Sequence, residues 1–335
     1  LYLLGRDRVS KAVHWFSILM VAVGATMSAF WIIVANSWQQ TPAGYVIRHG
    51  RAELTDFWAA VFNPSTLDRF YHTMVACLIA GAFLMAGISA YLILKNKGGG
   101  VPRKSMRMAL IFGLVASLMA LFPTGHQHAQ QVARTQPEKL AAMEGHIRGG
   151  QRAALTVFGI PQEEPPELKL AIRIPGMLSW LAFNDTDAFV PGIEDLQAAG
   201  RPTPPMVLTF VSFHGMVGLG TLFIAMMVIS VFLLYRKKLF DTRWLLKLLL
   251  WSIPLPLAAC ELGWITAEVG RQPWVVYGEL RTAEAFSANV AAGEVLFSII
   301  MFGLIYLVLG ALYVYILSKQ VRQGPEAVPI TEARE

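Results

Sequence analysis

Residues 207–234, VLTFVSFHGMVGLGTLFIAMMVISVFLL, form an unbroken run of 28 residues without Asp, Glu, Lys or Arg. A membrane-spanning helix needs about 20 mainly apolar residues, so this stretch is long enough to cross a bilayer. The whole chain has the same character, with 55% hydrophobic residues and 15% charged residues among 335. Its mean hydropathy is +0.50. Soluble domains carry about 25% charged residues, and disordered chains combine low hydrophobicity with high charge, so this composition excludes both classes.

The sequence predicts an all-α, polytopic membrane helix bundle. Six stretches are apolar enough to span a membrane, and the third is the shortest: 12–34, 70–94, 107–122, 207–234, 244–262 and 295–317. The first residue is Leu1, and no charged leader with a cleavage site precedes the first stretch, so we expect the chain to be truncated at its N-terminus.

Lysine and arginine in the short connections predict the orientation of these helices. They gather before the first stretch, after the second, after the fourth and after the last, and with six spans these four segments lie on one side. The positive-inside rule assigns that side to the cytoplasm. Because the basic residues are distributed in this way, the net charge of +6 does not predict a nucleic-acid-binding face.

The predicted organisation has four parts. Residues 1–122 carry three transmembrane helices, 123–206 form a long extracytoplasmic loop, 207–317 carry three more helices, and 318–335 form a cytoplasmic tail. A loop of this length in a compact membrane protein is more often functional than idle. Cys77 and Cys260 both lie in apolar stretches and do not predict a disulfide framework.

Three polar or sulfur-bearing side chains at membrane depth are candidate ligands. His72, near the outer end of the second stretch, fits either a buried histidine bonded to backbone or a metal or haem ligand. Met216 fits either core packing or a haem ligand, since imidazole and thioether form a standard low-spin pair. His214 is a further candidate, and the spacing does not choose between it and Met216.

Two polar groups lie outside or at the edge of the predicted spans. Glu268 and Arg271, ahead of Trp274, fit either a local helix-ending ion pair or a carboxylate ligand or proton carrier beside a carboxylate-binding arginine. Lys139 and Glu144 lie on a predicted short helix within 135–145, with a proline near its start. They fit either a solvated surface helix or a site for a small polar ligand. His126 and His128, just before this helix, could relay protons or bind a stray metal, but they fit ordinary loop residues better.

Together these segments resemble subunit I of the cytochrome bd family of quinol oxidases. The resemblance covers nearly the whole chain in the family's order, and the last of its motifs is very specific. The motifs are residues 31–42 (WIIVANSWQQTP), 62–64 (FNP), 72–73 (HT) with 81–83 (GAF), 139–144 (KLAAME), 158–161 (FGIP), 212–218 (SFHGMVG) and 270–274 (GRQPW).

The resemblance implies residue roles. His72 and Met216 correspond to the axial ligands of a low-spin haem b, and Lys139 and Glu144 to the pair in the quinol-binding loop. Glu268 corresponds to a ligand of a high-spin haem, within a pair formed by haem b and haem d or by two haems b. Arg271 and Trp274 belong to the same motif beside these haems.

The resemblance also implies an activity and partners. Family members oxidise quinol at the outer face and reduce dioxygen to water, and the reaction is electrogenic without proton pumping. The implied location is the bacterial inner membrane. The implied partners are a related membrane subunit II, a small single-helix subunit in some members, and ubiquinol or menaquinol.

Three departures from the family pattern change these expectations. The family's first two helices and part of the third have no counterpart here, so we expect a fragment that is not competent alone. His214 stands where many relatives have arginine, and the region of His126 and His128 is nearer to the cyanide-insensitive branch. Two other classes remain as alternatives: a proton or ion transporter, and a haem b anchor that passes quinol electrons onward.

Overall fold

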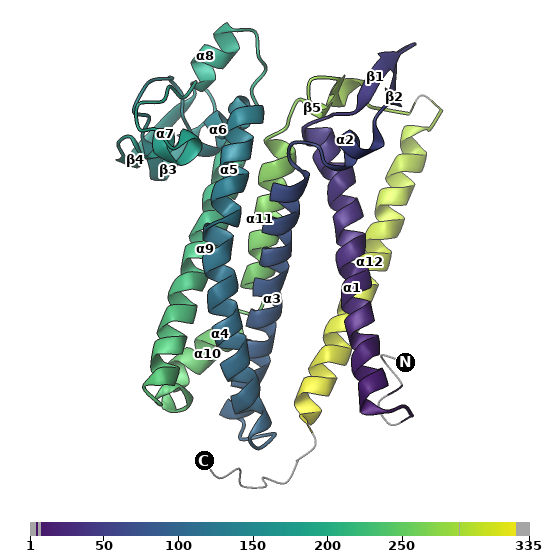
Figure 1. The fold of residues 1–335 in the computed structure, drawn as a ribbon, viewed down its shortest axis with the longest axis vertical. Helices are drawn as coiled ribbons and strands as arrows, with labels where there is room; N and C mark the ends of the chain where they lie inside the picture. The colour runs from purple at the N-terminus through teal and green to yellow at the C-terminus, as the bar shows by residue number, and fades with distance from the viewer. Residues whose placement is uncertain (1–4, 6–7, 288, 326–335) are drawn as a thin grey trace. The chain divides into compact units, whose positions relative to one another are not determined.

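The computed structural model describes residues 5, 8–287 and 289–325. The chain is mainly helical, with six long helical segments along the sequence (Figure 1). They are α1 (Lys11–Gln40), α3 (Thr66–Leu94), α4 (Val101–Leu121), α9 (Met206–Tyr235), the consecutive pair α10 (Arg243–Trp251) and α11 (Leu255–Val269), and α12 (Ala292–Gln323). Five of these are each long and apolar enough to cross a membrane, and the α10–α11 pair makes a sixth when it is counted as one span. The predicted helix bundle with about six spans is confirmed.

The fifth predicted stretch, 244–262, is not one continuous helix. It divides into α10 and α11, which meet at a bend of 40°. Pro254 lies in the break. Proline has no backbone N–H to donate and disfavours helical backbone in the residue before it, which explains the interruption. The hydropathy of the stretch does not report this break.

The third predicted stretch, 107–122, is longer than expected. Helix α4 begins at Val101, among basic residues, and α5 (Thr124–Thr135) follows after Pro123. The two together form a candidate span of 35 residues from Val101 to Thr135. Helix α4 by itself has 21 residues and is shorter than α1, α3, α9 and α12, as predicted for this stretch. It extends beyond the predicted start because long basic side chains at a helix end keep their charges in the interface while the backbone stays helical.

Short elements connect the long helices. The hairpin β1 (Tyr45–Arg48) and β2 (Arg51–Leu54) precedes α2 (Phe57–Val61). After α5 come α6 (Pro137–Glu144), the antiparallel hairpin β3 (Leu155–Gln162) and β4 (Glu167–Ile174), α7 (Met177–Phe183) and α8 (Ile193–Ala198). The remaining short elements are η1 (Leu239–Asp241), β5 (Trp274–Val276), β6 (Leu280–Arg281) and η2 (Thr282–Glu284).

The chain divides into two compact units. The first contains residues 1–75, 120–214 and 264–281, and the second contains residues 76–119, 215–263 and 282–335. The second unit packs through small residues: a side chain at Gly87 would meet Ile253, and one at Gly113 would meet Met227. Such close approach of helices through glycine is typical of membrane proteins.

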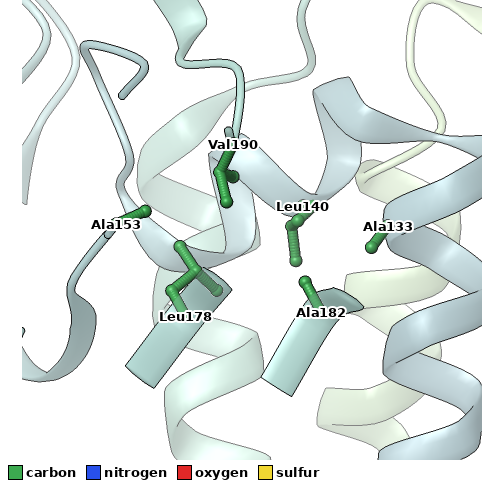
Figure 2. Packing of buried hydrophobic residues seen from close by; sticks show 6 residues of the cluster. All are labelled: Ala133, Leu140, Ala153, Leu178, Ala182 and Val190. Carbon is green, nitrogen blue, oxygen red and sulfur yellow. The ribbon is translucent and has the colours of Figure 1, made fainter. Parts of the chain in front are cut away.

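The first unit holds a small hydrophobic core inside the long connection (Figure 2). Leu140 of α6 and Ala133 of α5 pack with residues of α7 and of the segments on either side of it: Ala153, Leu178, Ala182 and Val190. This core fixes α6 against α5. Helix α6 begins with Pro137, which confirms the predicted short helix with proline near its start. It ends at Glu144, and Gly145 caps it with a left-handed φ of 58°.

Candidate functional site

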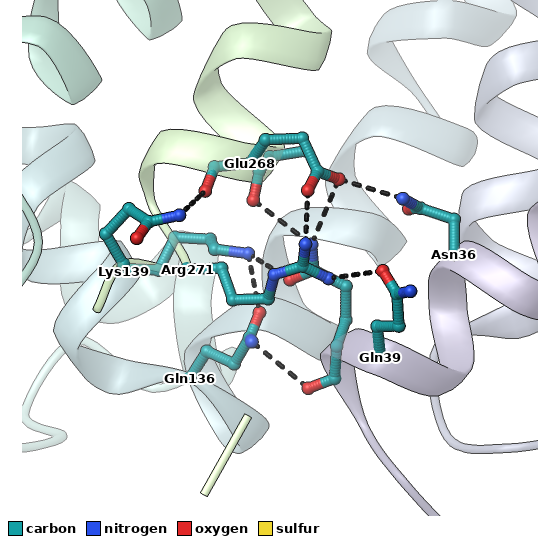
Figure 3. A network of polar contacts seen from close by, with 9 residues as sticks. Asn36, Gln39, Gln136, Lys139, Glu268 and Arg271 are labelled. Carbon is teal, nitrogen blue, oxygen red and sulfur yellow. Dashed lines mark hydrogen bonds and ion pairs between the residues drawn. The ribbon is translucent and has the colours of Figure 1, made fainter. Parts of the chain in front are cut away.

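A buried polar cluster lies in the first unit, where three segments distant in the sequence meet (Figure 3). Helix α1 contributes Asn36, Gln39 and Gln40 from its last two turns. The end of α11 contributes Glu268, and Arg271 follows it. Lys139 comes from α6, and Gln136 precedes that helix. The sequence indicated Lys139 and the Glu268–Arg271 pair as two separate candidate groups, and the structure brings them together.

Glu268 and Arg271 form an ion pair between Oε2 and Nη2. Asn36 Nδ2 donates to the other carboxylate oxygen, Oε1, at 2.8 Å. The second arm of the guanidinium, Nη1, donates to Gln39 Oε1 at 3.1 Å. The side chain of Arg271 is only 6% exposed, and burial lowers its pKa while Glu268 opposes that shift. The local ion pair, one of the two interpretations that the sequence left open, is present, and two amides of α1 hold it in place.

Lys139 is the most deeply buried charged side chain of the cluster, with 1% of its surface exposed. Its Nζ donates to Gln40 Oε1 at 2.5 Å and to Gln136 Oε1 at 2.7 Å. Gly270 packs directly against it, since a Cβ at Gly270 would lie 2.9 Å from Lys139 Cγ. Burial lowers the pKa of Lys139 well below its ordinary value, and Arg69 and Arg271 add to that shift while Glu268 opposes it.

Gln40 connects Lys139 to the Glu268 end of α11. The side chain is fully buried. Its Oε1 accepts from Lys139, while its Nε2 donates to the Ala267 carbonyl at 3.1 Å and reaches Glu268 Oε1 at 3.5 Å. The Gln40 carbonyl in turn accepts from Gln136 Nε2 at 3.1 Å. One amide therefore bridges the two groups that the sequence associated with different sites.

Glu144, which the family resemblance pairs with Lys139 in the quinol-binding loop, has other neighbours. It is 4% exposed, and its carboxylate accepts a hydrogen bond from the Thr156 backbone. Its Oε2 has no hydrogen-bond partner among the described residues. Burial raises the pKa of Glu144 from 4.5 to about 8, against the opposing effect of the Thr156 bond. At pH 7 the protonated form therefore predominates, which can donate a hydrogen bond as well as accept one.

His72 lies in the first unit beside two residues of α5. Its Nδ1 is 3.4 Å from Thr124 Oγ1, and its ring centroid is 5.5 Å from that of His128. The Nε2 atom of His128 is buried and has no hydrogen-bond partner among the described residues. His126 has different neighbours, since its ring packs 5.4 Å from Phe122 and 6.4 Å from Trp180.

His214 and Met216 have different surroundings although they are two residues apart. His214 places Nδ1 3.1 Å from the Phe210 carbonyl and Nε2 3.0 Å from the Thr156 carbonyl, so neither ring nitrogen is directed into open space. Met216 belongs to the second unit, where its Sδ lies 2.8 Å from the position that a Cβ on Gly263 would take. Gly263 thus leaves room for the thioether.

The sequence motifs predicted no role for Arg69 or for the amides Asn36, Gln39, Gln40 and Gln136. Arg69 is 5% exposed, and its charge acts on Glu268 and Arg271. Their positions in the sequence could have indicated a role. They lie at the ends of apolar stretches, and a polar side chain there needs a hydrogen-bond partner when that end is buried. Four of the five lie in segments already quoted for other reasons.

The charges of the cluster do not balance. The two guanidinium groups of Arg69 and Arg271 face one carboxylate, Glu268, and the Lys139 amine lies beside them. The Nε atoms of Arg69 and Arg271 are buried and have no partner among the described residues. Buried guanidinium groups of this kind suit an additional anion such as a carboxylate. Within the described ranges, no three His, Cys, Asp or Glu side chains are grouped so that they could hold a bare metal ion.

Comparisons with known proteins show the family. The model of the family described as cytochrome bd terminal oxidase subunit I matches residues 1–325. The chain belongs to this family. It is 39% identical over 334 residues to the cytochrome bd ubiquinol oxidase subunit 1 of Bacillus subtilis (strain 168), covering 97% of this chain and 71% of that protein.

A relative and a solved structure agree with this assignment. The chain is 32% identical over 394 residues to the cytochrome bd-II ubiquinol oxidase subunit 1 of Escherichia coli (strain K12), covering 98% of this chain and 76% of that one. The solved structure of the bd oxidase from Geobacillus thermodenitrificans matches with a TM-score of 0.87 and 31% identity, over 97% of this chain and 74% of that chain.

Membership in the cytochrome bd subunit I family confirms the resemblance seen in the sequence motifs. The protein is an integral membrane subunit of the respiratory terminal oxidase type, and its family carries haem. The transporter alternative is therefore set aside. The buried cluster around Lys139, Glu268 and Arg271 is the part of this cytochrome bd family member in which charged side chains are concentrated and enclosed.

Proposed function

We propose that this chain is the haem-carrying subunit of a quinol:oxygen oxidoreductase. It oxidises quinol at the extracytoplasmic face and delivers the electrons to haem centres that reduce dioxygen to water. Protons for the water come from the cytoplasm, so the reaction is electrogenic without pumping. The family assignment supports this class of activity, and the bridge from Lys139 through Gln40 to Glu268 is the observation that supports the arrangement of the site.

His72 and Met216 are the proposed axial ligands of a low-spin haem b. Imidazole and thioether are a suitable donor pair for such a haem. Met216 is preferred to His214, because both ring nitrogens of His214 lie against backbone carbonyls. Haem would supply reversible one-electron chemistry at these ligands.

Glu268 is the proposed carboxylate ligand of one high-spin haem. That haem belongs to a pair, formed by haem b with haem d or by two haems b. Asn36 and Arg271 orient its two oxygens. The unpartnered Nε atoms of Arg69 and Arg271 fit the carboxylates that a haem carries. Trp274 begins β5 three residues after Arg271, and it completes the proposed surroundings of these haems.

Lys139 and Glu144 are the proposed quinol-binding residues. The protonated Glu144 carboxyl can donate to a quinone carbonyl or accept from a quinol hydroxyl, while Lys139, with its lowered pKa, can accept a proton. The donor is ubiquinol or menaquinol. The proposed partners are a related membrane subunit II and a small single-helix subunit, in the bacterial inner membrane with the long loop outside.

Visible difference spectra test the ligand assignment. In membranes that contain the assembled oxidase, Met216→Leu is expected to abolish the low-spin haem b band in reduced-minus-oxidised spectra, because leucine cannot ligate iron. Met227→Leu is the matched control, since Met227 is fully buried in the same helix. Survival of the low-spin band in Met216→Leu would reject Met216 as a ligand.

A second pair of variants tests Glu268. Glu268→Gln is expected to shift or remove the high-spin haem signal while the low-spin band remains. Glu261→Gln, in the same helix with an exposed side chain, is expected to leave both signals intact. Equal spectra for the two variants would remove Glu268 from the proposed ligands. A preparation with low-spin haem b alone in the unmodified protein would favour an electron-passing anchor over an oxidase.

A further inference from the structure

Glu138, next to Lys139 on α6, belongs to a second ionic cluster that none of the assigned motifs explains. Its Oε1 accepts from Arg201 Nε at 2.5 Å, and its Oε2 accepts from the Tyr277 hydroxyl at 2.8 Å. Arg201 Nη2 also donates to the Tyr277 oxygen at 3.1 Å, which closes the triangle. All three residues lie in the first unit.

The three residues come from segments that are distant in the sequence. Glu138 is in the first turn of α6, Arg201 follows α8 near the end of the long connection, and Tyr277 lies in the turn between β5 and β6. The Tyr277 backbone N–H donates to the Gln39 carbonyl at 2.9 Å, so this turn is also fixed to the end of α1. The cluster thus ties α6 to the segment that follows Arg271.

Burial makes this contact more than a surface ion pair. The side chain of Glu138 is 7% exposed and that of Arg201 is 44% exposed. Exposed ion pairs contribute little, whereas a buried carboxylate that loses its partners is left with an uncompensated charge. Three comparable pairs on the first unit, such as Arg148 with Glu194 at 84% and 53% exposure, lack that burial.

Arg201 and Tyr277 both keep their protons at neutral pH. Burial, reinforced by Glu138, raises the pKa of Tyr277 to about 12, so its hydroxyl keeps the proton that it donates. Burial lowers the pKa of Arg201, but Glu138 and Tyr277 outweigh this effect and the net direction is upward. Tyr277 therefore remains a hydrogen-bond donor to Glu138, and Arg201 remains a cation beside it.

Glu138 and Lys139 are bound by different sets of partners. Glu138 is bound by Arg201 and Tyr277, and Lys139 is bound by Gln40 and Gln136 with Gly270 packed against its stem. We infer that Glu138, Arg201 and Tyr277 form a clasp that positions α6, and with it the Lys139 amine, for the quinol. This inference rests on the proposed role of Lys139 in quinol oxidation.

The clasp is tested with the assembled oxidase and a soluble quinol as the donor. Glu138→Ala is expected to raise the KM for quinol about fivefold or more, with kcat changed less than about twofold, because binding geometry is lost while the electron acceptors are untouched. Glu138→Gln keeps an acceptor for Tyr277 and should give a smaller rise. Tyr277→Phe removes only one hydroxyl. It provides the same test if the oxidase does not assemble with Glu138→Ala.

Amine labelling gives a readout independent of turnover. Lys139 is enclosed in the native protein, so an amine-reactive ester should label it slowly. Glu138→Ala and Tyr277→Phe are expected to speed this labelling at least about threefold, as measured by peptide mass spectrometry, because α6 opens more often. Glu194→Gln, in the exposed ion pair with Arg148, is the matched control and should change neither the labelling rate nor the KM.

Lys139→Met separates failure of the clasp from failure of the proposed function. If Lys139→Met raises the quinol KM and the clasp variants change neither KM nor labelling, the clasp is overturned and the donor site stands. If Lys139→Met leaves the quinol KM unchanged, the proposed role of Lys139 is wrong and the inference that depends on it is overturned too. A fall in kcat without a change in KM in the clasp variants would also overturn the inference of the clasp.

Discussion

The buried carboxyl of Glu144 couples the stability of the protein to pH. Its pKa in the folded state is about 8, compared with 4.5 for the ordinary value. Between these values the folded chain binds a proton that the unfolded chain has lost, so the contribution of Glu144 to stability falls as pH rises through this window. The ionised carboxylate is destabilised because it is buried and its Oε2 has no hydrogen-bond partner among the described residues.

Glu144→Gln is expected to remove this pH dependence, because glutamine does not ionise. The thermal unfolding temperature of the variant should be close to that of the unmodified protein at pH 5 and higher at pH 8, as followed by calorimetry in detergent. Glu167→Gln is the control, because Glu167 is exposed at the start of β4. A constant difference between the Glu144 variant and the unmodified protein across this pH range would contradict the raised pKa.

At the scale of elements, Glu163 connects the β3–β4 hairpin to α9. Its two carboxylate oxygens accept hydrogen bonds from the backbone N–H groups of Met206 and Val207, both at 2.9 Å. These N–H groups belong to the first turn of α9 and have no partner within the helix. A carboxylate there also interacts favourably with the helix dipole. The hairpin therefore stabilises the start of the helix that carries Met216.

Glu163→Gln is expected to destabilise the start of α9 by about 1 kcal/mol, since the amide retains one acceptor and loses the negative charge. Hydrogen exchange of residues 206–209 should become faster in the variant. Glu164→Gln changes the next residue in the same turn and should leave the exchange unaffected. Unchanged exchange in both variants would show that the hairpin does not cap α9.

At the scale of the whole molecule, the orientation of the helices is a prediction from charge alone. The basic residues of the connections after α3 and α9 are predicted to lie in the cytoplasm, and the long connection between α5 and α9 outside. The proposed quinol site lies in that long connection. If the orientation is reversed, quinol would be oxidised at the cytoplasmic face and the proposed electrogenic arrangement would fail.

Cysteine labelling tests the orientation. In a background lacking Cys77 and Cys260, Gln151→Cys is expected to react with a membrane-impermeant maleimide added to spheroplasts, because the residue is exposed in the long connection. Lys237→Cys, exposed after α9, should react only after the membrane is permeabilised. The opposite pattern of labelling would reverse the proposed topology.

Local sequence was sufficient for the features that depend on local composition. The apolar stretches predicted the membrane helices, and the proline near the start of α6 was predicted correctly. Order-specific motifs identified the family before any contact was known. These features depend on the hydropathy, backbone preferences and residue order of short segments, all of which are present in the linear chain.

Only the tertiary structure decided which polar groups meet. It joined Lys139 to Gln40 and Glu268, gave Glu144 a separate environment, and brought Glu138 to Tyr277, 139 residues along the chain. No local pattern encodes these pairs, because a buried polar group can be satisfied by any suitable partner that folding places beside it. The sequence determined where charge enters the apolar protein, and the packing of distant segments determined what each charge contacts.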